Sequence, residues 1–162
     1  YASLAEQFPI GFIEDALQEE DFEGFAMAKQ AVNATLIGDD FLCTNIERIK
    51  KAAEMDAISG MIMKPNQIGT VTKAIEAVRY IQSKGMLVVG SGRAGGVLDD
   101  PVAEMAIALG APLMKTGAPR SGERTIFTNF VLRVEEELNG TAKMTDVKDI
   151  PGFIRPQHRA WL

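Results

Sequence analysis

Short apolar segments alternate along the chain with longer segments in which apolar residues recur at helical spacing. The short apolar runs predict strands at five places: residues 11–14, 35–38, 60–63, 86–90 and 112–115. The longer segments predict a helix after each strand, at residues 20–32, 45–55, 71–83, 101–109 and 124–138. Residues 1–10 have the pattern of a helix end that leads into the first strand. The pattern therefore predicts five successive strand–helix units.

The polar residues at the strand ends discriminate between two folds. Strand–helix alternation predicts a parallel α/β sheet, because parallel strands need crossover connections, and both a doubly wound sheet and a (β/α) barrel satisfy it. Each predicted strand ends at an ionisable or hydroxyl residue, and these residues follow one another about 25 positions apart: Glu14, Asp39, Lys64, Ser91 and Lys115. In a barrel such positions converge on the carboxyl-terminal mouth. This favours a TIM-like (β/α) barrel.

Five units do not close such a barrel, which needs eight strands and about 250 residues. We therefore expect a partial barrel that is completed by another chain, by an N-terminal part of the same chain or by self-association, so that an oligomer is expected. The chain begins at Tyr1, without a methionine, and its opening residues already have the pattern of a helix end that leads into a strand. That beginning suggests a fragment or a processed chain.

The last segment of the chain, residues 141–162, departs from the strand–helix rhythm and contains two prolines. We expect two parts, a barrel portion over residues 1–140 and an irregular C-terminal tail over residues 141–162. The tail is expected to pack across a surface of the barrel portion. Its candidate anchors are Phe153, Ile154 and Trp161.

Composition and charge narrow the classes of partner. The 162 residues are 46% hydrophobic, which suffices for one core. The net charge is −5, without a run of basic residues that could neutralise a row of phosphates, so nucleic acid is not an expected partner. No apolar run approaches the roughly 18 residues that a membrane span requires. The single cysteine, Cys43, cannot form an internal disulfide, which favours a reducing, cytoplasmic setting.

Two acidic pairs follow neighbouring strands and form the first candidate site. Glu14 and Asp15 end one predicted strand, and Asp39 and Asp40 end the next. Carboxylates that converge from adjacent strands form a hard oxygen site that suits Mg²⁺. Alternatively, the pairs cap the helices that follow them.

Lys64 is the second candidate, because it ends an apolar strand and its amine would enter the mouth. Lysine can act as a base where a neighbouring cation lowers its pKa, and both Mg²⁺ and Lys115 would act in that direction. Pro65 favours an extended backbone at Lys64. The alternative is an ordinary surface lysine. The only histidine, His158, lies in the tail, so a histidine base is not expected.

A glycine-rich turn with one arginine, residues 91–96, follows the fourth strand. Its backbone N–H groups and Arg93 could hold a phosphate. The turn matches neither a Walker motif nor a dinucleotide fingerprint. The sequence after Lys115, TGAPRSGER, is a second loop rich in glycine and arginine, which either positions Lys115 or turns the chain.

Five segments between residues 8 and 138 together resemble enolase: FIED, GDD-x-x-x-TN, KPNQIGT, KTGAP and LRVEEEL. Enolases are Mg²⁺-dependent lyases of glycolysis that interconvert 2-phosphoglycerate and phosphoenolpyruvate. The resemblance implies that Glu14 and Asp39 are two of three magnesium ligands, and that Lys64 is the base. It further implies that Lys115 supports the substrate carboxylate and that Arg93, beside Ser91, binds the phosphate.

The chain departs from the enolase pattern in the turn after the fourth strand. Enolases read S-H-R-S-G-E there, whereas this chain has Gly92, Ala94 and Gly96 at three of the six positions and so loses a histidine, a serine and a glutamate. Enolases also have proline where this chain has Ala16. The first metal aspartate, the general-acid glutamate and the mobile loops of enolases precede this stretch and are not in the chain.

Three interpretations follow from the resemblance. The first is an enolase-type lyase subunit or fragment, inactive alone, that dehydrates 2-phosphoglycerate or a related phosphorylated hydroxy acid when a complementary part completes the barrel. The second is a non-catalytic enolase relative with a structural or regulatory role. The third is another member of the enolase superfamily, such as an acid-sugar dehydratase or a racemase, although KPNQIGT and KTGAP favour enolase itself.

Overall fold

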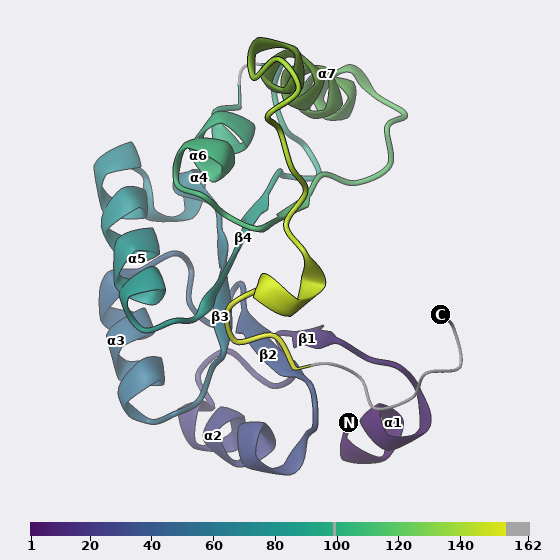
Figure 1. The fold of residues 1–162 in the computed structure, drawn as a ribbon. Helices are drawn as coiled ribbons and strands as arrows, with labels where there is room; N and C mark the ends of the chain where they lie inside the picture. The colour runs from purple at the N-terminus through teal and green to yellow at the C-terminus, as the bar shows by residue number, and fades with distance from the viewer. Residues whose placement is uncertain (99, 155–162) are drawn as a thin grey trace.

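The computed structural model describes residues 1–98 and 100–154, and its centre is one parallel sheet (Figure 1). The strands lie in the order β1-β2-β3-β4-β5, so every strand is followed along the sheet by the next strand of the chain. Their bounds are β1 Phe12–Glu14, β2 Thr35–Gly38, β3 Gly60–Met63, β4 Leu87–Ser91 and β5 Leu113–Lys115. The sheet curls into part of a barrel, which confirms the predicted partial (β/α) barrel.

The helices that connect the strands cover the convex face of the sheet (Figure 1), and one further helix precedes the first strand and one follows the last. Their bounds are α1 Ala2–Gln7, α2 Phe22–Ala31, α3 Ile46–Glu54, α4 Pro65–Ile68, α5 Val71–Ser83, α6 Val102–Ala108 and α7 Gly122–Glu137. A helix was predicted in each of these places except that of α4. This single turn has Pro65 at its first position and ends at Gly69, whose φ of 85° suits glycine.

Alternate residues of the strands face two different cores. Met61, Met63 and Val88 belong to the large outer core between sheet and helices. Ile62 and Leu87 belong to a smaller inner cluster. Because strand side chains alternate between faces, Asp39, Lys64 and Ser91 share the face of the inner cluster at the carboxyl ends of their strands.

The C-terminal tail crosses the inner face of the sheet after α7, as the yellow ribbon in Figure 1 shows. Within it lies the 3₁₀ turn η1 Val147–Asp149, which leads to Ile150. Ile150 is 8% exposed and joins the inner cluster, against which Phe153 also packs. The Thr35 hydroxyl donates to the Gly152 carbonyl (3.2 Å) and accepts from the Ile154 N–H (2.7 Å). The expected anchors Phe153 and Ile154 thus contact the barrel portion.

Two further expectations concern the end of the chain and membranes. Trp161 and His158 lie outside the described residues. Over residues 1–98 and 100–154, none of the helices combines the length and the apolarity that crossing a membrane requires. The proposed division at residue 140 stays a prediction.

Candidate active site

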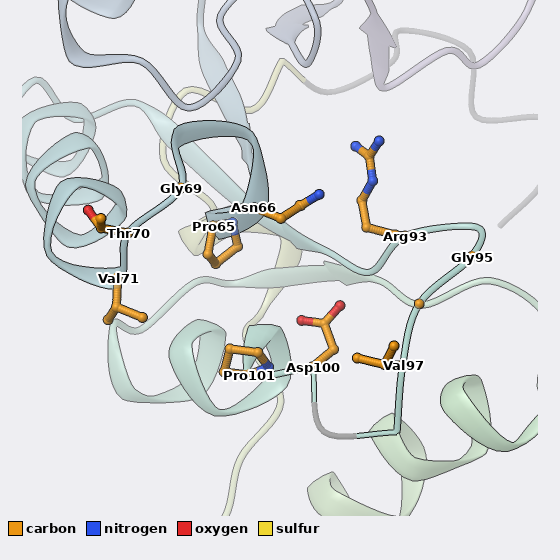
Figure 2. A pocket seen from close by; sticks show the side chains of 11 residues that line it. Pro65, Asn66, Gly69, Thr70, Val71, Arg93, Gly95, Val97, Asp100 and Pro101 are labelled. Carbon is orange, nitrogen blue, oxygen red and sulfur yellow. The ribbon is translucent and has the colours of Figure 1, made fainter.

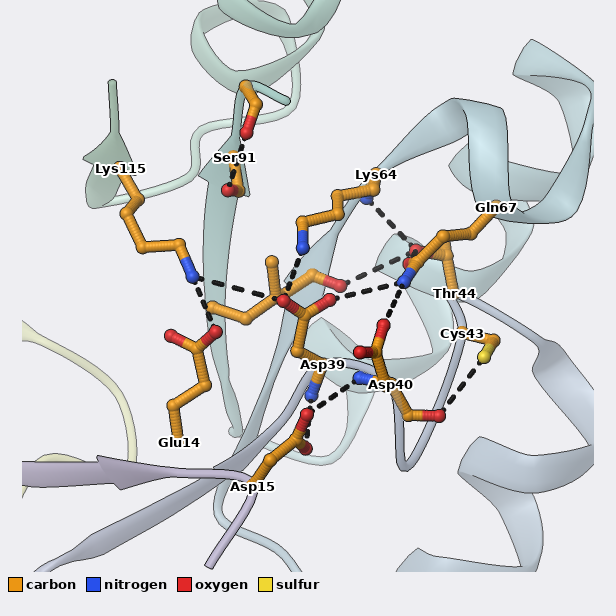
Figure 3. A network of polar contacts seen from close by, with 12 residues as sticks. Glu14, Asp15, Asp39, Asp40, Cys43, Thr44, Lys64, Gln67, Ser91 and Lys115 are labelled. Atoms are coloured by element: carbon orange, nitrogen blue, oxygen red, sulfur yellow. Dashed lines mark hydrogen bonds and ion pairs between the residues drawn. The ribbon is translucent and has the colours of Figure 1, made fainter. Parts of the chain in front are cut away.

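Four charged side chains from four segments meet at the carboxyl ends of the strands (Figure 3). Lys115 Nζ at the end of β5 lies 2.5 Å from Glu14 Oε1 at the end of β1 and 3.8 Å from Asp39 Oδ2. Lys64 Nζ, directly after β3, donates to the same Asp39 oxygen. The structure thus brings together Glu14, Asp39, Lys64 and Lys115, as the barrel interpretation predicted.

Burial divides this cluster into an inner and an outer pair. Asp39 and Lys64 are only 5% and 8% exposed, whereas the side chains of Glu14 and Lys115 are 32% and 45% exposed. Burial by itself would raise the pKa of the Asp39 carboxyl. The hydrogen bond and the charge of Lys64, with smaller contributions from Glu14 and Lys115, outweigh burial and lower that pKa below its ordinary value. Asp39 is therefore an anion at neutral pH.

Residues that the sequence analysis did not single out hold the inner pair in place. Gln67, in α4, donates through Nε2 to Asp39 Oδ1 (3.2 Å) and to Asp40 Oδ1 (3.1 Å). The buried Thr44 hydroxyl accepts from the backbone N–H of Lys64 (2.9 Å). Gln67 lies three residues after Lys64, so one helical turn brings its side chain back to the strand end. If a helical turn had been predicted after Lys64, Gln67 could have been identified as a neighbour of the site.

The acidic pairs do not cap the helices that follow them. The N-cap of α2 is Asp21, whose side chain accepts from the Gly24 N–H. The N-cap of α3 is Asn45, whose side chain accepts from the N–H groups of Glu47 and Arg48. The capping alternative is therefore wrong. Asp15 instead accepts hydrogen bonds from the backbone after β2, at Asp39 N (2.8 Å) and Asp40 N (2.8 Å).

Ser91 and Arg93 lie at the end of β4 but outside this cluster of four charges. Ser91 is fully buried, and its hydroxyl donates to the Gly92 carbonyl (3.1 Å). Arg93 is exposed and borders an open cavity of about 380 Å³, whose lining also includes Asn66 and Asp100. Figure 2 shows its guanidinium pointing away from Asp100. Within the described residues Arg93 forms no ion pair, so its charge is available to an anion.

Gly92 stands at the position where the resemblance to enolases implies a histidine, and the structure shows what occupies the adjoining space. A Cβ atom on Gly92 would lie 3.1 Å from the ring of Phe127 in α7, which is tighter than an ordinary contact. Phe127 is itself 5% exposed and belongs to the outer core. A histidine at position 92 would therefore require Phe127 to shift.

The donor set of this chain fits part of a magnesium site. Glu14 and Asp39 provide carboxylate oxygens from adjacent strands, the ligand type that Mg²⁺ prefers. No group of three or more His, Cys, Asp or Glu side chains that could hold a metal ion occurs in residues 1–98 and 100–154. A magnesium ion held by these two carboxylates would need further ligands from water, substrate or another part of the protein.

Comparison with known proteins gives a consistent result. Residues 1–150 match the family model "Enolase, C-terminal TIM barrel domain". The chain is 43% identical over 138 residues to the enolase of Methanocaldococcus jannaschii, covering 85% of this chain and 33% of that protein. It is 40% identical over 145 residues to the enolase of Aeropyrum pernix and 43% identical over 145 residues to that of Methanopyrus kandleri, covering 88% of this chain and 34% of each relative.

The aligned region covers most of this chain but only a small part of each relative. The chain spans about one third of the length of the curated enolases that it matches. The family match covers more than half of the chain, and it includes all five strands and the four clustered charges. The chain therefore belongs to the enolase family, and it corresponds to the C-terminal region of the enolase barrel.

Proposed function

We propose that this chain is the C-terminal portion of an enolase-type lyase, which dehydrates 2-phosphoglycerate to phosphoenolpyruvate in glycolysis, or acts on a related phosphorylated hydroxy acid. The observation that carries the proposal is the convergence of Lys64 and Lys115 with Glu14 and Asp39 at one end of the sheet. Two lysines beside two carboxylates suit a reaction that removes a proton next to a substrate carboxylate.

Each side chain has a distinct role in this proposal. Lys64 acts as the base that takes the proton from the carbon next to the carboxylate. That step places a second negative charge on the carboxylate oxygens, and Lys115 Nζ stabilises it from the other side of Asp39. Glu14 and Asp39 would hold Mg²⁺, which would supply further positive charge to stabilise the carboxylate. Arg93, beside Ser91, binds the phosphate.

The proposed reaction needs groups that the described residues do not bring to this cluster. A third carboxylate and a general acid must come from a complementary chain or from an N-terminal part that also closes the barrel. We therefore expect the chain to be inactive alone and active in an assembly of the two parts. A glycolytic role places that assembly in the cytoplasm.

The test is to combine the chain with the separately produced upstream part of a related enolase and to add 2-phosphoglycerate and Mg²⁺. Formation of phosphoenolpyruvate is followed by its ultraviolet absorbance. Activity should require both parts and should be lost in Lys64→Ala. Lys73→Ala, which removes an exposed lysine of α5, is the matched control and should retain activity.

A second candidate function is that of a non-catalytic enolase relative. The observation that favours it is the packing of Phe127 beside Gly92, because it fills the space next to the position of the enolase histidine. Folded, assembled protein without Mg²⁺-dependent turnover of any phosphorylated hydroxy acid would support this alternative over a lyase.

A further inference from the structure

Asp15 connects the two strands that carry the candidate metal ligands. It directly follows Glu14, and its backbone N–H donates to the Ile37 carbonyl of β2 (3.1 Å). Its carboxylate accepts from three consecutive N–H groups, with Oδ1 at 2.8 Å from Asp39 N and 3.4 Å from Phe41 N, and Oδ2 at 2.8 Å from Asp40 N. One side chain therefore holds the start of the β2–α3 turn (Figure 3).

The backbone of Asp15 has the conformation that this arrangement needs. Its φ is +44°, in the left-handed region that residues other than glycine rarely adopt. The chain leaves β1 at Asp15. With this backbone conformation, the Asp15 side chain reaches the end of the neighbouring strand β2. Such a conformation persists only where surrounding contacts fix it, and the three hydrogen bonds to an anionic acceptor are such contacts.

The turn that Asp15 holds is fixed from its other side as well. Phe41 and Leu42 are fully buried, and the Asp39 carbonyl accepts from the N–H groups of Leu42 (3.0 Å) and Cys43 (2.7 Å). Cys43 itself has a φ of +49°. The backbone of Asp39 thus lies between apolar anchors on one side and the Asp15 carboxylate on the other.

Neither of the two ordinary roles of an aspartate in a loop accounts for this arrangement. Asp15 does not cap α2, whose N-cap is Asp21. It also forms no ion pair within the described residues, so its charge is directed at backbone N–H groups alone. Its distinguishing feature is that it is bonded covalently to Glu14 and by hydrogen bonds to the backbone of Asp39.

We propose that Asp15 is a positioning residue, which sets the separation and orientation of the Glu14 and Asp39 carboxylates and thereby the affinity of the site for a divalent cation. The proposal rests on the function proposed above, in which these two carboxylates hold the metal. Asp15 does not touch the cation in this account. It acts through the backbone of Asp39, in the way that outer residues orient metal ligands in proteins.

The substitution Asp15→Asn tests the proposal with little change in shape. Asparagine keeps one acceptor oxygen but turns an NH₂ group toward N–H donors, and it lacks the charge that strengthens the hydrogen bonds. The matched control is Asp40→Asn, which removes one charge from the same turn. The Asp40 carboxylate accepts only from Gln67 among the described residues, and it holds no backbone N–H.

The first measurement is amide hydrogen exchange in the metal-free chain. In Asp15→Asn the amides of Asp39 and Asp40 should exchange faster by about tenfold, because each loses a charge-assisted hydrogen bond. The amide of Val88, in the core of the sheet, should be unchanged, and Asp40→Asn should leave the turn protected. Full protection of the two amides in Asp15→Asn would overturn the proposal.

The second measurement is titration with Mn²⁺ of the chain completed by the upstream part of a related enolase, followed by electron paramagnetic resonance of the free ion. Asp15→Asn should weaken Mn²⁺ binding by about 10–100-fold, the usual cost of losing an outer residue of a metal site, and Asp40→Asn should weaken it much less. Equal losses in the two variants would overturn a positioning role. Failure of the assembly with the unchanged chain to bind Mn²⁺ is a different result, which would count against the metal site of the proposed function.

Discussion

Replacing Ile150 by alanine removes from the inner face of the sheet the most buried side chain of residues 141–154, the part of the tail that the structure describes. Ile150 is 8% exposed and packs with Ile37, Ile62, Leu87 and Val89. Isoleucine-to-alanine changes in protein cores cost about 2–5 kcal/mol of unfolding free energy. Because this cluster is small and its tail segment can relax, we expect a loss of about 2–3 kcal/mol, at the lower end of that range.

Urea denaturation followed by far-ultraviolet circular dichroism measures this loss. In thermal denaturation, at about 2–4 °C per kcal/mol for a domain of this size, the melting temperature should fall by about 4–12 °C. Val147→Ala is the control, since Val147 lies three residues earlier in the tail and is 52% exposed, and its effect should stay within about 0.5 kcal/mol. A similarly small effect of both substitutions would refute the view that the tail stabilises the open barrel from inside.

Three further predictions concern single contacts, and denaturation experiments check each of them. Asp39→Asn leaves the buried Lys64 without its carboxylate and should cost about 3–5 kcal/mol at pH 7. The folded-state pKa of Asp39 is lowered from its ordinary value of 3.8. The stabilisation that the Asp39 carboxylate provides should therefore be fully present above pH 3.8 and be lost as the pH falls through the lower folded-state pKa. Gly92→His should cost about 1–3 kcal/mol, and less in a Phe127→Ala background, since the ring obstructs the new side chain. Gly152→Ala should cost more than about 1 kcal/mol, because φ is +65° and its Cβ would lie 2.8 Å from a backbone oxygen.

The strands could be predicted closely because their sequences carry a strong local signal. TLIG at Thr35–Gly38 and GMIM at Gly60–Met63 are short apolar runs between polar segments, and both predicted spans agree with the structure. Helix α5 at Val71–Ser83 was equally clear from its apolar spacing. The turn α4 at Pro65–Ile68 was missed because its four residues are too few to show a helical period.

The convergence of the charges was predictable, but their partners were not. Parallel strands place their carboxyl ends at one edge, so the order of polar residues along the chain predicted that Glu14, Asp39, Lys64 and Lys115 would meet. Which lysine pairs with which carboxylate depends on tertiary distances that spacing does not contain. The proximity of Gly92 and Phe127 could not be predicted either, because the two residues lie far apart in the sequence and meet only in the folded structure.

The most direct test of the central claim is exchange of the proton that Lys64 is proposed to remove. The chain, completed by the upstream part of a related enolase, would be incubated with 2-phosphoglycerate and Mg²⁺ in D₂O, and the proton on the carbon next to the carboxylate would be followed by nuclear magnetic resonance. We predict loss of that proton signal with the unchanged chain and with Lys73→Ala, and retention of the signal with Lys64→Ala. Exchange that persists in Lys64→Ala, in folded and assembled protein, would contradict the account.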